Sequence, residues 1–172
     1  WSNLNSLEFL SIHFFRTFLH ISYALTPALF VHFTIIFPRD NTEKWRNILK
    51  INYLIAITFA SINTYAFITA LSVFTDESIN KYLFVFNLLR IYLIICVIIS
   101  ISFFISAFIK ENGKAEKQQL KWLLFGFIIG PLSFVVLWVL PILFFGKAFI
   151  PEEIVMILIC AIPITFAIAI IK

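Results

Sequence analysis

Charged side chains are scarce in this chain. Asp, Glu, Lys and Arg make up 13% of the 172 residues, whereas a water-soluble domain carries roughly a quarter. In their place, 62% of the residues are hydrophobic, 22 residues are Phe, and the mean hydropathy is +1.01. So few charges and so many large apolar side chains suit a lipid-facing surface better than a soluble core, and we expect lipid to be the solvent for most of the chain.

Motifs for catalysis and cofactors are also missing. The chain has no H-E-x-x-H, G-x-S-x-G or P-loop sequence, so we expect no enzymatic activity in this segment. Cys96 and Cys160 form no C-x-x-C pair and are expected to behave as small apolar side chains. All three histidines lie in the first apolar run, which disfavours a haem held between helices, and no carboxylate lies mid-run, which disfavours proton-coupled transport. We expect neither a cofactor nor a metal.

Long apolar runs recur five times along the chain. The hydrocarbon layer of a bilayer is about 30 Å thick and requires about 20 helical residues. Backbone groups in lipid must find partners within their own segment, so runs of this length without period-2 alternation predict helices. The sequence therefore predicts an all-α, polytopic transmembrane bundle that forms a single domain over residues 1–172. The five expected helices, antiparallel to their neighbours, cover residues 7–37, 51–74, 81–109, 122–145 and 154–171.

Basic residues are distributed unevenly between the ends of these helices. The first and third connections and the last residue hold nine of them: Arg39, Lys44, Arg46, Lys50, Lys110, Lys114, Lys117, Lys121 and Lys172. The second and fourth connecting regions hold only Lys81 and Lys147. Because cytoplasmic loops are rich in Lys and Arg, we expect the C-terminus in the cytoplasm and Trp1 outside, in the plasma membrane. The net charge of +4 then reflects topology, and no nucleic-acid partner is expected.

Both ends of the sequence lie next to apolar runs. It begins at Trp1 without an initiator Met, has no signal peptide, and stops at Lys172 directly after the fifth run. An outside N-terminus without a signal peptide predicts at least one further span upstream. We therefore expect this chain to be a fragment of a longer one.

One group of polar residues is predicted near the outer face of the membrane. His13, Arg16 and His20 share one helical face, because they are spaced i, i+3 and i+7. Twenty residues counted back from the cytoplasmic ends of the first and third helices reach Phe18 and Arg90, which places Arg16 and Arg90 in one layer with Asn87. Two interpretations stay open. The arginines extend to lipid headgroups, or the five residues line a pocket for an anionic or peptide ligand, extracellular or within the membrane.

Other residues suggest how the helices pack. Asn63 lies in the middle of the second helix, where a polar side chain favours a partner on another helix. Gly126 and Gly130 have the G-x-x-x-G spacing that allows two backbones to approach closely. Four prolines are expected to kink their helices, since each lacks an N–H and crowds the carbonyl four residues back. They are Pro27, Pro131, Pro141 and Pro163.

The C-terminal third of the chain resembles a known family. Residues 115–172 contain a basic loop ending in Q-L-K-W, a helix closing with V-L-P, a short loop with Phe149, Ile150 and Pro151, and a final helix with I-P-I-x-F-A. Residues 25–38, LTPALFVHFTIIFP, match the helix before the family's first basic loop. These stretches are similar to the membrane region of ComP-type sensor histidine kinases and related multispan signalling proteins.

The resemblance implies a sensory input module whose last helix leads into a cytoplasmic output domain. It also implies a homodimer formed through that downstream domain, with histidine kinase activity located there. The phosphoacceptor His and the ATP-binding region of the family have no counterpart in residues 1–172. Two other functions remain open from the residues: a structural or assembly subunit of a membrane complex, and part of a transporter with helices interrupted by Pro and Gly.

Overall fold

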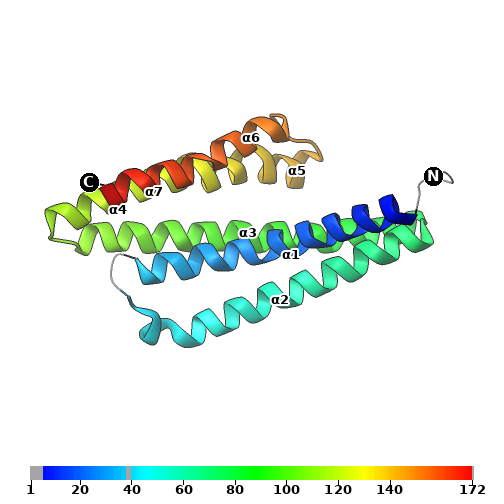
Figure 1. Cartoon of the computed structure of the whole chain (residues 1–172), viewed down its shortest axis with the longest axis horizontal. Helices are drawn as coiled ribbons and strands as arrows, with labels where there is room; N and C mark the ends of the chain where they lie inside the picture. The colour runs from blue at the N-terminus through cyan, green and yellow to red at the C-terminus, as the bar shows by residue number, and fades with distance from the viewer. Residues whose placement is uncertain (1–5, 38–39, 172) are drawn as a thin grey trace. The chain divides into compact units, whose positions relative to one another are not determined.

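Helices form almost all of the described structure. The computed structural model describes residues 6–37 and 40–171, with the backbone alone for residues 6–13, 152, 153, 156, 161, 166, 170 and 171. These ranges contain no strand, so the all-α prediction is confirmed for them. The elements, drawn in Figure 1, are α1 (Ser6–Ile36), α2 (Thr42–Val73), α3 (Asp76–Lys110), α4 (Lys114–Phe127), π-helical η1 (Ile128–Leu132) and η2 (Val135–Val139), α5 (Leu140–Phe145), α6 (Glu152–Ile159) and α7 (Ala161–Ile171).

Four helices are long and apolar enough to cross a membrane. They comprise Phe14–Ile36, Thr42–Val73, Asp76–Lys110 and the continuous stretch Lys114–Phe145 from α4 to α5. Large apolar side chains are exposed along them, such as Phe14 at 73% and Phe144 at 77%. A soluble protein would bury many of these side chains, whereas lipid accommodates them. These four helices agree with the first four predicted spans.

The fifth predicted span is divided into two shorter helices. α6 has eight residues and α7 has eleven, and they are separated at Cys160. Pro163 explains the break, because it has no N–H to donate to the carbonyl of Ile159 one turn earlier. A five-span count and the direction of each span therefore stay predictions.

Three helices begin earlier than hydropathy indicates. α2 begins at Thr42 rather than near residue 51, α3 at Asp76 rather than near residue 81, and α4 at Lys114 rather than near residue 122. Hydropathy detects only the part of a helix that is apolar, whereas Lys, Glu and Gln also favour helix formation in water. Parts of the predicted first and third connections are therefore polar helical turns.

The chain is divided into two compact units, and α1, α2 and α3 each contribute to both. Unit 1 consists of α1 up to Leu29 and of Trp45–Leu93. Alanines make up much of its interior, and small side chains allow transmembrane helices to approach closely. The buried alanines are Ala24, Ala28, Ala56, Ala60 and Ala70. α2 and α3 are joined by a short turn at Phe74 and Thr75.

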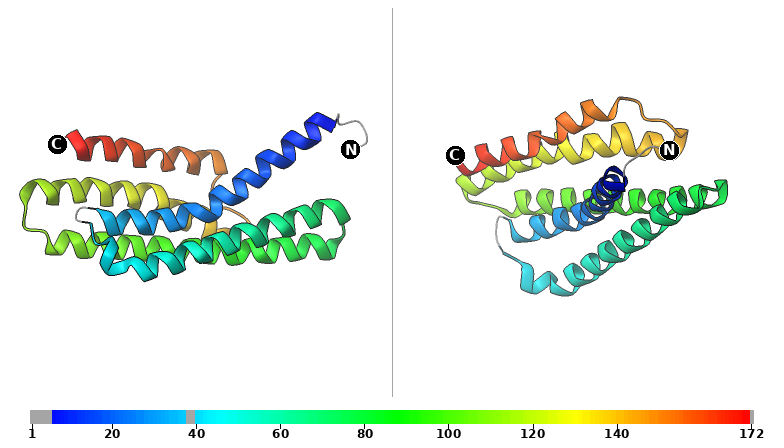
Figure 2. Two further views of the ribbon diagram at one scale, coloured as in Figure 1. Left: turned by 60° about the horizontal axis from the view of Figure 1, so that its bottom comes forward. Right: turned by 45° about the vertical axis from the view of Figure 1, so that its right-hand side comes forward.

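Unit 2 consists of the described residues of Phe30–Lys44 and Ile94–Lys172. Its core is formed by Phe104, Leu120, Leu123, Phe127 and Ala169, with further phenylalanines packed against them. The segments α4, η1, η2 and α5 follow one another in a single rod, and α7 lies alongside α4 (Figure 2). Pro131 lies inside the first π-helical turn, whereas Pro141 lies in the first turn of α5, where α-helical geometry resumes.

Candidate functional site

The predicted polar group centres on His20, which projects from α1 into the interior of unit 1. This side chain is only 8% exposed. Its Nδ1 lies 2.6 Å from the carbonyl oxygen of Arg16, one turn earlier, and its Nε2 lies 2.9 Å from the hydroxyl of Tyr82 on α3. A carbonyl oxygen only accepts, so Nδ1 carries a proton and, in the neutral ring, Nε2 accepts from Tyr82. One histidine thereby connects α1 to α3.

Aromatic rings from α2 and α3 surround this histidine. The ring of Phe67 on α2 lies 4.8 Å from that of His20, centroid to centroid, and Phe86 on α3 lies 6.0 Å away. Tyr23 on α1 stacks on Phe86 at 5.4 Å. Such contacts contribute about 0.5–1.5 kcal/mol each beyond the area they bury. All three helices of unit 1 therefore contact one another through this group of rings.

Arg90 also lies against Phe86. It is 9% exposed, and its Nη1 donates to Oδ1 of Asn87 at 2.6 Å. Its Cζ lies 4.6 Å from the Phe86 ring centroid, within the range of a cation–π interaction. The Arg90 side chain is thus directed into the helices of unit 1, not outward along their surface.

Arg16 differs from Arg90 in its exposure. Its side chain is exposed, with Cζ 5.8 Å from the centroid of the Phe67 ring, which also contacts His20. The side chain of His13 lies outside the described residues. Four of the five predicted site residues, Arg16, His20, Asn87 and Arg90, therefore belong to one group, joined through Phe67 and Phe86.

Sequence reasoning missed most of the aromatic members of this group. Tyr82, Phe86 and Arg90 follow one another at i, i+4 and i+8, so their shared helical face could have been found from spacing. Phe67 gave no such signal, because its place beside His20 depends on how α2 packs against α1. We call the set Arg16, His20, Tyr23, Phe67, Tyr82, Phe86, Asn87 and Arg90 the polar–aromatic cluster.

The polar residues deeper in unit 1 form two different arrangements. Asn63 is fully buried; its Nδ2 donates to the Phe59 carbonyl of its own helix at 3.1 Å, and its Oδ1 has no hydrogen-bond partner among the described residues. Tyr92 on α3, in contrast, donates its hydroxyl to Oδ1 of Asn52 on α2 at 2.7 Å. The sequence suggested a partner on another helix for Asn63, and the structure shows such a partner for Asn52 instead.

The two glycines of the G-x-x-x-G motif contact α7 within unit 2. A Cβ added to Gly126 would overlap Oγ1 of Thr165, and one added to Gly130 would lie 2.9 Å from Cγ1 of Ile162. Real Cβ atoms do not approach side chains so closely, so these positions need glycine. The motif therefore serves packing of the last helix against the α4–η1 rod inside one chain.

Aromatic rings pack against the buried side chains of the cluster. Three pockets of about 740, 490 and 500 Å³ have other linings, and none of these includes His20, Asn87 or Arg90. No group of three or more His, Cys, Asp or Glu side chains that could hold a metal ion occurs in the part of the chain that the structure describes. What the cluster offers chemically is a buried guanidinium, bonded to Asn87 of its own helix, and an imidazole that one hydrogen bond joins to Tyr82 of another helix.

Comparison with known proteins gives no relative. The chain matches no protein-family model, and neither a curated protein nor a solved structure is similar to it.

Proposed function

We propose that this chain is the membrane-embedded sensory input and signal-transmitting region of a bacterial-type signalling protein. In this proposal it belongs to a sensor histidine kinase of the ComP type, lies in the plasma membrane with Trp1 outside and Lys172 in the cytoplasm, and precedes the catalytic domain. The observation that supports it is the polar–aromatic cluster. Ionisable groups inside membrane helices are costly, and they are usually retained for a function.

The cluster is suited to respond to small helix movements. The His20–Tyr82 hydrogen bond joins α1 to α3, and the His20–Phe67 ring contact joins α1 to α2, so a shift of about 1–2 Å between helices would disturb both. A signal that favours one arrangement then shifts the population between two states of the bundle. α1 and α3 are continuous from unit 1 into unit 2, and they supply a physical route for such a shift.

The last helix is the element that would carry the output. α7 is packed against Gly126 and Gly130 without space for another side chain, so movement of the α4–η1 rod must move α7 with it. In the proposed topology α7 ends at the cytoplasmic face. A displacement of α7 there would change the arrangement of the two kinase subunits.

The first experiment measures signalling by the full-length protein. Arg16→Ala combined with Arg90→Ala is expected to change the dose–response of autophosphorylation in isolated membranes, while membrane insertion stays as in the wild type. Arg90→Lys, which keeps the charge, distinguishes loss of the cluster from misfolding, and Lys147→Ala is the matched control at an exposed basic position. A double variant with an unchanged dose–response rejects the cluster as the input element.

The reading frame after Lys172 is an independent check. We expect a dimerisation helix with a phosphoacceptor His, followed by an ATP-binding domain. A stop codon at that point rejects the kinase form of the proposal.

The second candidate function is that of a structural subunit of a membrane complex. It is favoured by the cluster being packed with aromatic rings and by the many exposed apolar side chains, which suit contact with other membrane helices. Purification in mild detergent separates the two functions. A structural subunit is expected to copurify with larger partners in fixed stoichiometry, whereas an input module is expected as a homodimer.

A further inference from the structure

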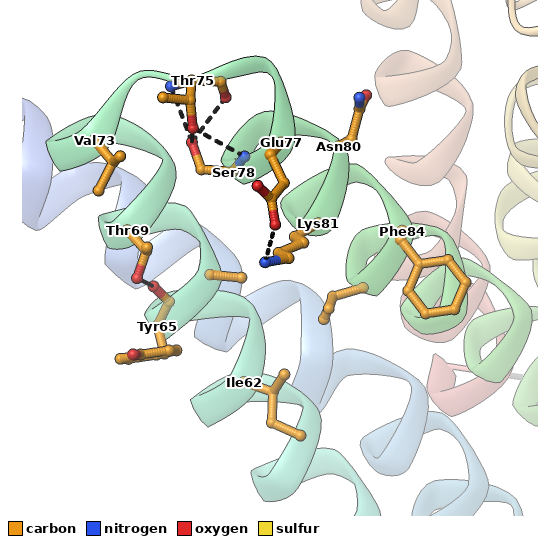
Figure 3. A pocket seen from close by; sticks show the side chains of 12 residues that line it. Ile62, Tyr65, Thr69, Val73, Thr75, Glu77, Ser78, Asn80, Lys81 and Phe84 are labelled. Carbon is orange, nitrogen blue, oxygen red and sulfur yellow. Dashed lines mark hydrogen bonds and ion pairs between the residues drawn. The ribbon is translucent and has the colours of Figure 1, made fainter.

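A groove of about 740 Å³ lies between the C-terminal part of α2 and the start of α3, within unit 1 (Figure 3). Its lining changes character along its length. Ile62, Ala66 and Val85 line one end, whereas Glu77, Asn80 and Lys81 line the other. A groove that is apolar at one end and charged at the other fits an amphiphile better than a wholly apolar or wholly polar ligand.

The charged end is fixed by hydrogen bonds at the turn. Thr75 N donates to Oγ of Ser78 at 3.2 Å, and Ser78 N donates to Oγ1 of Thr75 at 3.3 Å, which is a reciprocal cap at the start of α3. One turn into α3, Nζ of Lys81 lies 2.6 Å from Oε1 of Glu77, and both side chains are more than 70% exposed. The groove therefore presents one cation and one anion side by side, with no net charge.

The apolar part has the depth of one bilayer leaflet. From Ile62 to Val73 the groove follows α2 over eleven residue-to-residue steps, or about 16 Å at 1.5 Å per step. Half of the hydrocarbon core is about 15 Å. With Ile62 near the midplane, the Glu77–Lys81 pair lies at the level of the headgroups. Figure 3 shows both charged side chains beside Thr75 and Ser78 and away from Ile62.

We propose that this groove binds one phospholipid whose zwitterionic headgroup carries a primary ammonium. The phosphate is placed at Lys81, the ammonium at Glu77, and one acyl chain lies along the apolar part. An anionic headgroup would be repelled by the carboxylate of Glu77. A quaternary ammonium has no N–H to donate to a carboxylate, so a primary ammonium is preferred. The site does not depend on the sensory function, because a structural subunit with this groove would bind the same lipid.

The experiment uses the full chain in vesicles of equal parts phosphatidylethanolamine, phosphatidylcholine and phosphatidylglycerol, each tested in turn with a photoreactive acyl chain. We expect phosphatidylethanolamine to be crosslinked about threefold to fivefold more than either other lipid, as a single exposed ion pair allows. Mass spectrometry is expected to locate the crosslinks at Ile62, Ala66 or Val85. Equal crosslinking of all three lipids, or a preference for phosphatidylglycerol, overturns the proposal.

Two variants with matched controls separate the headgroup from the acyl chain. Glu77→Gln is expected to remove the preference for phosphatidylethanolamine over phosphatidylcholine, whereas Glu116→Gln, at an exposed glutamate on α4, is expected to keep it. Ala66→Phe fills the groove and is expected to abolish the crosslinks there, while Ser102→Phe, at an exposed position of α3, leaves them intact. Crosslinks that persist in Ala66→Phe, or a preference that persists in Glu77→Gln, contradict the site.

Discussion

The interiors of the two units differ in chemistry. Unit 1 buries His20, Asn63 and Arg90 among alanines, whereas the core of unit 2 is built from Phe104, Phe127 and other large apolar side chains. Hydrogen bonds are directional and can exchange partners when helices shift, but a close-packed apolar core resists any change of volume. The difference suggests that substitutions in unit 2 act mainly on stability, and those in unit 1 mainly on response.

The largest effect is expected in the core of unit 2. Phe104 is fully buried, with its ring centroid 4.9 Å from that of Phe127 and 5.9 Å from that of Phe33. Phe104→Ala leaves a cavity and is expected to lower the free energy of unfolding in bicelles by about 3–5 kcal/mol. Phe144→Ala removes a ring that is 77% exposed and should change it little. Equal effects would remove the distinction between core and lipid-facing rings.

The next effect concerns the glycine contact with α7. Gly126→Leu forces the side chain against Thr165 and is expected to cost about 1–3 kcal/mol of unfolding free energy. Proteolysis of the C-terminal segment in detergent should become faster, because α7 is displaced. Ala115→Leu, at an exposed position of α4, is the control. If the Gly126→Leu variant were as stable as the control, α7 would not pack closely against Gly126.

In unit 1 the hydrogen bond of His20 is expected to contribute less to stability. Tyr82→Phe removes only the hydroxyl that His20 accepts from and should cost about 1 kcal/mol, as interhelical hydrogen bonds in membranes do. Its effect on the signalling dose–response should exceed that of Phe144→Ala at equal expression. Tyr65→Phe, with an exposed side chain, serves as the control. A purely structural cluster would lower stability without any change in response.

Asn63 and Asn52 are expected to respond in opposite directions. Asn63→Leu removes an acceptor with no partner among the described residues and should raise the unfolding free energy by up to about 1 kcal/mol. Asn52→Leu removes the acceptor of the Tyr92 hydroxyl and should lower it. The free energy of unfolding of each variant is to be measured in bicelles and compared with that of the wild type. Destabilisation by Asn63→Leu would mean that a polar group at this position is needed.

The smallest effect is a pH dependence outside the spans. Asp40 accepts hydrogen bonds from the backbone N–H (2.8 Å) and the hydroxyl of Thr42, and these lower the pKa of its carboxyl below the ordinary value of 3.8. The ionised carboxylate therefore stabilises the start of α2 above that value, and the stabilisation is lost as the pH falls through the lowered pKa. Hydrogen exchange at the Thr42 amide should become faster over this window. In Asp40→Asn, which has no carboxyl group at this position, the exchange rate of the Thr42 amide should not show this additional rise as the pH falls.

Several features of the fold were accessible from sequence because they depend on local composition. Four apolar runs predicted four membrane-length helices, since in lipid the backbone has no alternative to hydrogen bonding within a helix. The helix breaks at Cys160 and the polar starts of α2 and α4 were less accessible. The break depends on a single residue, Pro163. The polar starts are charged helical turns, which a hydropathy profile does not detect.

Composition along the chain was enough to predict a helical, apolar protein, and residue spacing pointed to Arg16, His20, Asn87, Arg90 and the two glycines of the G-x-x-x-G motif. The contacts of these residues followed only from the packing of the helices: Phe67 and Phe86 around His20, Asn52 rather than Asn63 as the partner of another helix, and Thr165 against Gly126. The reason is that the two kinds of interaction act over different separations along the chain. Helix formation is set by neighbours along the chain, whereas side-chain partners are set by which helix faces meet, and lipid imposes little choice between apolar faces.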